Sequence, residues 1–321
     1  NTAVGRNAMQ AQTSGSDNTA FGNAALYTNS TASNNSAFGS AALLSNTTGA
    51  SNTAVGKGAL DANTTADDNT GIGTNALTDN TTGGLNTSIG SEALANNTTA
   101  DENTAVGSLS LFTNTTGGSN TAVGHDSLRL NTTGASNSAF GVNALRANTT
   151  GASNVAVGIN SLSANTTADN NTAVGYAALT ANSTGHSNTA VGDTALDANT
   201  SGDSNVAIGR YALTANTTAN ENVAVGQGAL GASLTGPFNV AVGTSALAAN
   251  TTGGDNVGVG HSALLANTGA TNTAVGNDAG KANTTGGYNI FLGRDAGITG
   301  SPGGNNTTGN GSIFLGDENI G

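Results

Sequence analysis

The chain contains no cysteine, and only 8% of its 321 residues are charged and 3% aromatic. Without cysteine, neither disulfides nor thiolate metal sites are available to stabilise the fold. With so few large side chains, the chain cannot build one thick globular core. No apolar run approaches the roughly 18 residues of a membrane-spanning helix, so we expect no membrane insertion in this segment.

Positive charge is also scarce. The sequence has 7 basic and 19 acidic residues, which gives a formal net charge of −12. Nucleic acids and anionic membranes are normally bound by surfaces rich in Lys and Arg. The charge therefore argues against both as main partners, and it favours solubility and self-repulsion between fibres.

What the sequence has instead is a repeat of 17 residues, shown well by residues 171–187. Repeats begin at every seventeenth residue from Asn1 to Asn256 without insertion or deletion, and the repeat at Asn256 is one residue short. Later repeats begin at Asn272 and Asn289, and a longer excursion precedes residues 312–316. We therefore expect a regular repeat rod at 1–271 and variant C-terminal repeats at 272–321 that lead into a further region of a longer protein.

The pattern within a repeat predicts an all-β fold. Numbering the places of a repeat from its first Asn, Gly at the fifth place and an Asn-Thr-Thr-Gly turn at the twelfth to fifteenth disfavour a helix. Each repeat then forms one coil, and about nineteen 17-residue coils stack about 4.8 Å apart as a β-solenoid or β-roll. Stacked Asn residues at the first place are expected to form a hydrogen-bonded ladder.

Alternation along the strand suggests which side chains lie inside. Thr172 and Val174, at the second and fourth places, share one face, which we predict to be the interior. Leu179 and Ala181, at the ninth and eleventh places, give a second short inward face. The predicted coil core is therefore Val174, Leu179 and Ala181.

The opposite face is made of very small residues, namely Ala173, Gly175 and Ala178. A face meant for water would carry polar side chains, whereas small residues allow another backbone to approach closely. We predict that this face is the contact between parallel copies related by an axis along the rod. The alternative is a monomeric solenoid with a flat wall of small residues.

Variable residues occupy a few places against this constant frame. All basic residues stand at the sixth or tenth place, and nine acidic residues stand at the sixteenth or seventeenth. Tyr176, Tyr211 and His186 vary at the sixth, seventh and sixteenth places, and they are the candidates for surface recognition.

Chemistry-bearing residues are too dispersed for an active site. His125, His186 and His261 lie in different repeats, and no nucleophile–base set or phosphate-binding loop occurs at a usable spacing. We expect no catalytic residues, no cofactor and no enzymatic activity. Calcium binding at residues 67–69 or 101–103 is the weaker interpretation, because surface charge explains the same acids.

The threonine-rich turn has two further interpretations. Many of its Asn residues are N-glycosylation acceptors by sequence, although turn chemistry explains them without sugar. They are Asn46, Asn63, Asn80, Asn97, Asn114, Asn131, Asn148, Asn165, Asn216, Asn250 and Asn283. Regular threonine hydroxyls also suggest an alternative function, in which a monomeric solenoid binds ice or carbohydrate along a Thr/Asn face.

The motif Asn-Thr-Ala-Val-Gly-x-x-Ala-Leu resembles the repeats of trimeric autotransporter adhesin heads, which form a left-handed β-roll in parallel trimers. The whole repeat with Asn-Thr-Thr-Gly looks like repeats of bacterial and phage tail-fibre proteins. Those tail-fibre repeats are often followed by a self-cleaving chaperone of the endosialidase type. Residues 289–297 and 312–316 look like the repeats that precede that chaperone. The adhesin repeats are shorter, so the long turn here is a departure.

Together the pattern and the resemblance predict a homotrimeric extracellular fibre on a cell surface or virion. The chain would form the structural shaft or head and mediate attachment. The partners expected are two further copies of the chain and a surface receptor or glycan that the sequence does not identify.

Overall fold

The computed structural model describes residues 1–298 and 306–316, and these form an all-β parallel β-solenoid. Each coil contributes one strand of three residues, at its second to fourth places. The repeat therefore specifies one strand and a long series of turns. The predicted fold class of stacked 17-residue coils is confirmed.

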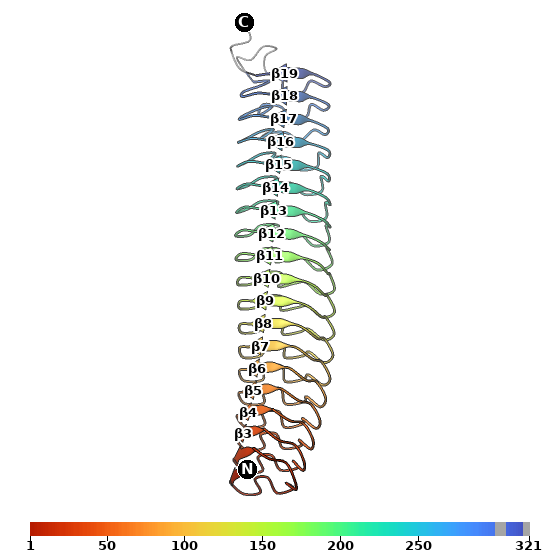
Figure 1. Cartoon of the computed structure of the whole chain (residues 1–321). Helices are drawn as coiled ribbons and strands as arrows, with labels where there is room; N and C mark the ends of the chain where they lie inside the picture. Colours follow the sequence, from red (N-terminus) through yellow and green to blue (C-terminus); the bar gives the residue numbers. More distant parts are fainter. Residues whose placement is uncertain (299–305, 317–321) are drawn as a thin grey trace. The chain divides into compact units, whose positions relative to one another are not determined.

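The chain divides into two compact units, at Asn1–Asn160 and Ser161–Gly321. In the first, strands stack in single file (Figure 1): β1 (Thr2–Val4), β2 (Thr19–Phe21), β3 (Ser36–Phe38), β4 (Thr53–Val55), β5 (Thr70–Ile72), β6 (Thr87–Ile89), β7 (Thr104–Val106), β8 (Thr121–Val123), β9 (Ser138–Phe140) and β10 (Val155–Val157).

The described residues of the second unit repeat the arrangement with β11 (Thr172–Val174), β12 (Thr189–Val191), β13 (Val206–Ile208), β14 (Val223–Val225), β15 (Val240–Val242), β16 (Val257–Val259), β17 (Thr273–Val275), β18 (Ile290–Leu292) and β19 (Ile313–Leu315). Within each unit, neighbouring strands pair in parallel and in register, so that each place lies against the same place of the next coil.

Two ladders of buried asparagine hold the coils together, and they confirm the predicted ladder. At the first place, the backbone N–H of Asn188 donates to Oδ1 of Asn171 at 2.9 Å. At the twelfth place, Nδ2 of Asn182 donates to Oδ1 of Asn165 at 3.1 Å. Nδ2 of Asn171 and Nδ2 of Asn182 both donate to the carbonyl of Gly185, which links the two ladders inside the coil.

The predicted inward and outward faces of the strand are wrong. Ala173 and Ala178 are fully buried inside the coil, while Val174 and Thr172 are only partly buried on the outer face. In coils with leucine at the ninth place, the interior is narrow at the third place. A Cβ at Gly71, a third-place residue, would lie 3.2 Å from Cγ of Leu60 in the preceding coil.

Leu179 lies in the core as predicted, but Ala181 is only partly buried. Neither belongs to a second strand, because the chain turns here. Leu179 has a left-handed backbone with φ 54°, and its N–H donates to the carbonyl of Ala195 at 2.9 Å. The left-handed conformation costs about 1–2 kcal/mol, and burial of a leucine side chain contributes about 1.5–3 kcal/mol. Leucine burial therefore offsets the strain of the turn.

The coil interior changes composition near its C-terminal end. In β18 and β19 the third place becomes Phe291 and Phe314, whose rings stack 5.2 Å apart. The ninth place becomes Gly280 and Gly297. A Cβ at Gly280 would lie 2.7 Å from Cδ2 of Phe291, so the ring occupies the space that leucine fills in regular coils.

We expect Leu179→Gly to destabilise the fold less than Leu179→Ala, by about 0.5–1 kcal/mol. Both variants lose the buried side chain, but only glycine relieves the left-handed strain. Denaturant unfolding of the two variants side by side measures the difference. The control is Ala178→Gly, because Ala178 does not have a positive φ. This variant should be less stable than the wild type, as is usual when glycine replaces alanine. A lower stability for Leu179→Gly than for Leu179→Ala would contradict the account.

A second prediction concerns the exchange of leucine for phenylalanine. Gly280→Leu should destabilise the fold because the new side chain overlaps Phe291, and Phe291→Ala should cost about 3–5 kcal/mol through its cavity. The double variant should lose clearly less stability than the sum of the losses of the two single variants. Thermal or denaturant unfolding measures these losses. Additive losses would show that the two places do not share one space.

Candidate functional site

The most distinctive surface is a row of exposed and half-buried apolar side chains along the outer face of the strands. We call these fourth-place residues the apolar row. In the first unit they are Val4, Phe21, Phe38, Val55, Ile72, Ile89, Val106, Val123, Phe140 and Val157. In the second they are Val174, Val191, Ile208, Val225, Val242, Val259, Val275, Leu292 and Leu315.

The apolar row leaves a substantial area open to solvent. Phe38 is 41% exposed and Ile208 is 40% exposed. The rings of Phe21 and Phe38 stack with centroids 5.4 Å apart, so neighbouring coils present a continuous surface. Second-place residues, such as Val155 at 36% exposure, widen it. All-parallel sheets are normally covered on both faces, which makes an open face of this kind unusual.

The residues predicted to contact another copy do not lie on this surface. Ala173 and Ala178 point into the coil, and a Cβ on Gly175 would overlap the carbonyl oxygen of Gly192 in the next coil of the same chain. Gly175 also has φ 140°, which only glycine adopts without strain. The small residues thus reflect close approach between coils of one chain, and the prediction of a small-residue interface is wrong.

A signal for the true exposed face was present in the sequence. The fourth place accepts Val, Phe, Ile or Leu, whereas the third place is Ala in most coils. A narrow interior of constant cross-section tolerates little change in side-chain volume. Variation in size at the fourth place therefore indicates the outside of the coil.

The three candidate recognition residues do not converge on one site. Tyr176 and Tyr211 lie at the turn that follows the strand, and Tyr176 is 58% exposed. His186 lies in the column of sixteenth-place residues. Its Nδ1 accepts the backbone N–H of Asp169 at 3.0 Å, and its own N–H donates to Oδ1 of Asp203 at 2.7 Å. His186 therefore takes part in the stacking of coils.

Tyr211 belongs to a smaller polar group. Nη2 of Arg210 donates to Oη of Tyr211 at 2.6 Å, and the guanidinium lies 4.4 Å from the ring centroid. Nε of Arg210 lies 3.6 Å from Oδ2 of Asp193 in the preceding coil. The group is exposed to solvent, so these contacts mainly orient the arginine.

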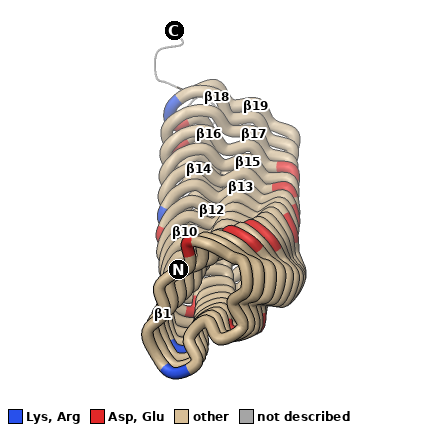
Figure 2. Tube along the Cα trace, turned by 60° about the horizontal axis from the view of Figure 1, so that its bottom comes forward, with Lys and Arg blue, Asp and Glu red and all other residues tan. Residues whose placement is uncertain are grey.

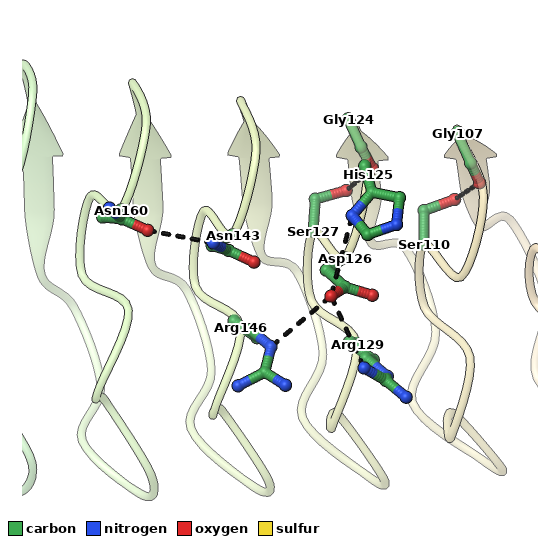
Figure 3. A network of polar contacts seen from close by, with 10 residues as sticks. All are labelled: Gly107, Ser110, Gly124, His125, Asp126, Ser127, Arg129, Asn143, Arg146 and Asn160. Carbon is green, nitrogen blue, oxygen red and sulfur yellow. Dashed lines mark hydrogen bonds and ion pairs between the residues drawn. The ribbon is translucent and has the colours of Figure 1, made fainter.

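A second polar cluster surrounds Asp126 in the first unit (Figure 3). Oδ2 of Asp126 lies 3.4 Å from Nη1 of Arg129, 3.7 Å from Nε of Arg146 and 3.6 Å from Nδ1 of His125. One nearly buried carboxylate therefore lies between two arginines of adjacent coils. Its chemistry is that of an internal ion-pair cluster, which reduces the repulsion between the arginines.

No family model, curated protein or solved structure matches the chain. The geometry of the chain itself defines its fold, a parallel β-solenoid of 17-residue coils. Within residues 1–298 and 306–316, no helix has the length and apolarity that a membrane span requires.

The acids considered for calcium binding have other roles. Oδ1 of Asp67 accepts the backbone N–H of Ala50 at 2.7 Å, and Oδ1 of Asp101 accepts that of Gly84 at 2.7 Å. Each carboxylate therefore links two coils. In the described part of the chain, no three His, Cys, Asp or Glu side chains gather as potential metal ligands.

The Asn residues of the glycosylation sequences are fully buried in the twelfth-place ladder. Nδ2 of Asn63, for example, donates to Oδ1 of Asn46 and to the carbonyl of Ala66. A glycan on this nitrogen would require the coil to open, so turn and ladder chemistry account for the sequence. The same burial removes asparagine from the Thr/Asn face of the alternative function, although the fourteenth-place threonines remain exposed.

Burial raises the pKa of Asp61 above its usual value of 3.8, and the charge of Asp79 adds to this effect. A hydrogen bond from Oγ1 of Thr78 to Oδ1 of Asp61, at 3.1 Å, opposes it. Because the folded state holds the proton more tightly than the unfolded state, Asp61 contributes stability below pH 3.8 that is lost as pH rises through the folded pKa.

We therefore expect Asp61→Asn to be more stable than the wild type at neutral pH and equal to it well below pH 3.8. Asparagine keeps an acceptor for Thr78 and carries no charge. Thermal unfolding across this pH range measures the difference. A difference that is independent of pH would show that the substitution acts through packing.

Proposed function

We propose that the chain forms the structural shaft or head of an extracellular attachment fibre, as a parallel homotrimer. The observation that carries the proposal is the apolar row, which follows the strands of each unit on the face that neighbouring coils leave open. Exposed contiguous apolar surface of this kind marks protein–protein contact. A further copy of the same chain is the partner whose repeat matches the row coil for coil.

Cyclic symmetry limits the number of copies that this contact can join. A contact related by rotation about an axis parallel to the stack closes after a fixed number of copies, whereas other heterologous contacts produce open filaments. Three copies would bring their apolar rows to a common axis. The resemblance to trimeric adhesin heads and tail-fibre repeats supports this number and an attachment role on a cell surface or virion.

The composition suits a structural role. The three histidines stand in separate coils, and the carboxylates of Asp67, Asp101 and Asp203 accept backbone hydrogen bonds between coils. The polar groups are thus engaged in holding the stack. A receptor or glycan would be bound by the variable residues of the turns, or by another part of the fibre.

The alternative is a monomeric solenoid that binds ice or carbohydrate. It now rests on the exposed fourteenth-place threonines, such as Thr116 and Thr133, which stand in successive coils. In that case the apolar row would have no partner, and the chain would sediment as a monomer. The mass in solution therefore separates the two functions.

Sedimentation equilibrium should give about 92 kDa, three times the chain mass of 30.7 kDa. Replacing three neighbouring residues of the apolar row by lysine should shift the mass towards the monomer, because a buried unpaired charge is costly. The substitutions are Val174→Lys, Val191→Lys and Ile208→Lys.

The matched control carries three lysines on the same coils at the exposed fourteenth place, as Thr184→Lys, Ser201→Lys and Thr218→Lys. It should retain the mass of the wild type, and circular dichroism should show both variants folded. A wild-type mass near 31 kDa would exclude the assembly, and an unchanged mass in the apolar-row variant would show that copies meet elsewhere.

A further inference from the structure

The apolar row is flanked by two columns of variable residues at opposite ends of the strand. The seventeenth place directly precedes the buried first Asn of the next coil, and the sixth place follows the glycine that ends the strand. In Figure 2, acidic and basic segments lie at opposite ends of the strand labelled β1. We call these columns the seventeenth-place flank and the sixth-place flank.

Charges on the two flanks are correlated within single coils. Lys or Arg occupies the sixth place in four coils, of which the last, containing Arg294, runs into the residues that are not described. Each of the other three coils ends in an acid at its seventeenth place. The pairs are Arg6 with Asp17, Lys57 with Asp68, and Arg210 with Glu221. Only two other seventeenth places are acidic, at Glu102 and Asp255.

Contacts within the chain do not explain the correlation. All six side chains are exposed, and in none of the three pairs do the two partners form an ion pair with each other in the single chain. Arg210 contacts Asp193, which belongs to a different coil. The members of each pair lie on opposite flanks of the strand, so an ion pair between these two places would have to form with another copy of the chain.

A parallel cyclic assembly supplies that partner. Rotation about an axis parallel to the stack brings the sixth-place flank of one copy against the seventeenth-place flank of the next, with the same coils at the same height. An antiparallel two-fold contact would instead place each flank against its own kind. The height difference within a coil is less than one strand spacing of about 4.8 Å, which long side chains span.

We infer that ion pairs between the sixth place of one copy and the seventeenth place of its neighbour set the direction and register of the assembly. This inference rests on the proposed homotrimer. A repeated apolar row alone specifies register poorly, because a slip of one coil leaves nearly the same contacts. The charges remove this ambiguity, since a slip would place Lys57 against Ser51 or Leu85.

Charge reversal at fixed net charge tests the inference. The matched variant carries Lys57→Glu and Arg210→Glu with Asp68→Lys and Glu221→Lys, so that two of the three pairs are reversed and the pair of Arg6 and Asp17 is unchanged. The mismatched variant carries the same two basic-to-acidic changes with Glu102→Lys and Asp255→Lys. Both keep the net charge of −12, because two reversals in each direction cancel.

Sedimentation velocity over a dilution series, at low ionic strength, should show wild-type association for the matched variant and at least about tenfold weaker association for the mismatched one. The difference should shrink at high salt. Equal association of the two variants with an intact wild-type trimer would overturn the inference alone. A monomeric wild type would overturn the proposed assembly as well.

Cysteine cross-linking gives a second measurement that does not depend on affinity, because the chain has no cysteine of its own. A chain carrying Lys57→Cys and Asp68→Cys should form covalent oligomers on mild oxidation. Lys57→Cys with Glu102→Cys, two coils out of register, should not. Equal cross-linking of the two chains would show that the register is not fixed.

Discussion

The structure depends on the close stacking of nearly identical coils, which leaves backbone groups at the centre of each coil away from water. Buried amide and carbonyl groups are costly unless they are hydrogen-bonded. Asn171 and Asn182 meet this requirement, since each side chain bonds both within its coil and to a neighbouring coil. With the two ladders in place, the coil needs only a thin apolar interior.

That interior explains most of the constant places of the repeat. Ala173 and Ala178 are fully buried in it, and Leu179 fills the remainder from a strained turn. Where glycine replaces the leucine, at Gly280, a phenylalanine from the next coil occupies the space. The third and ninth places therefore share interior space, which either alanine with leucine or phenylalanine with glycine can fill. In a regular coil, the larger side chains of the strand therefore lie on its outer face.

The outward side chains connect the fold to its proposed assembly. Because each coil is thin, a strand of three residues exposes its second and fourth side chains on a face that the same chain does not cover. Apolar residues on that face favour its burial against a partner. Because the coils repeat, the same contacts with the partner would recur in each coil. Charges on the two flanks then supply the direction and register that a uniform row lacks.

Period, fold class, strand position and the asparagine ladder were determined by the sequence, because each follows from a spacing that nearly all coils keep. The tertiary structure decided which face of the strand is inside. Alternation places Ala173 and Val174 on opposite faces of the strand but does not show which face is inside, so side-chain size alone predicts the wrong one. Only the stacked coils show that the interior has room for alanine and leucine but not for valine as well, so that the apolar row lies on the surface.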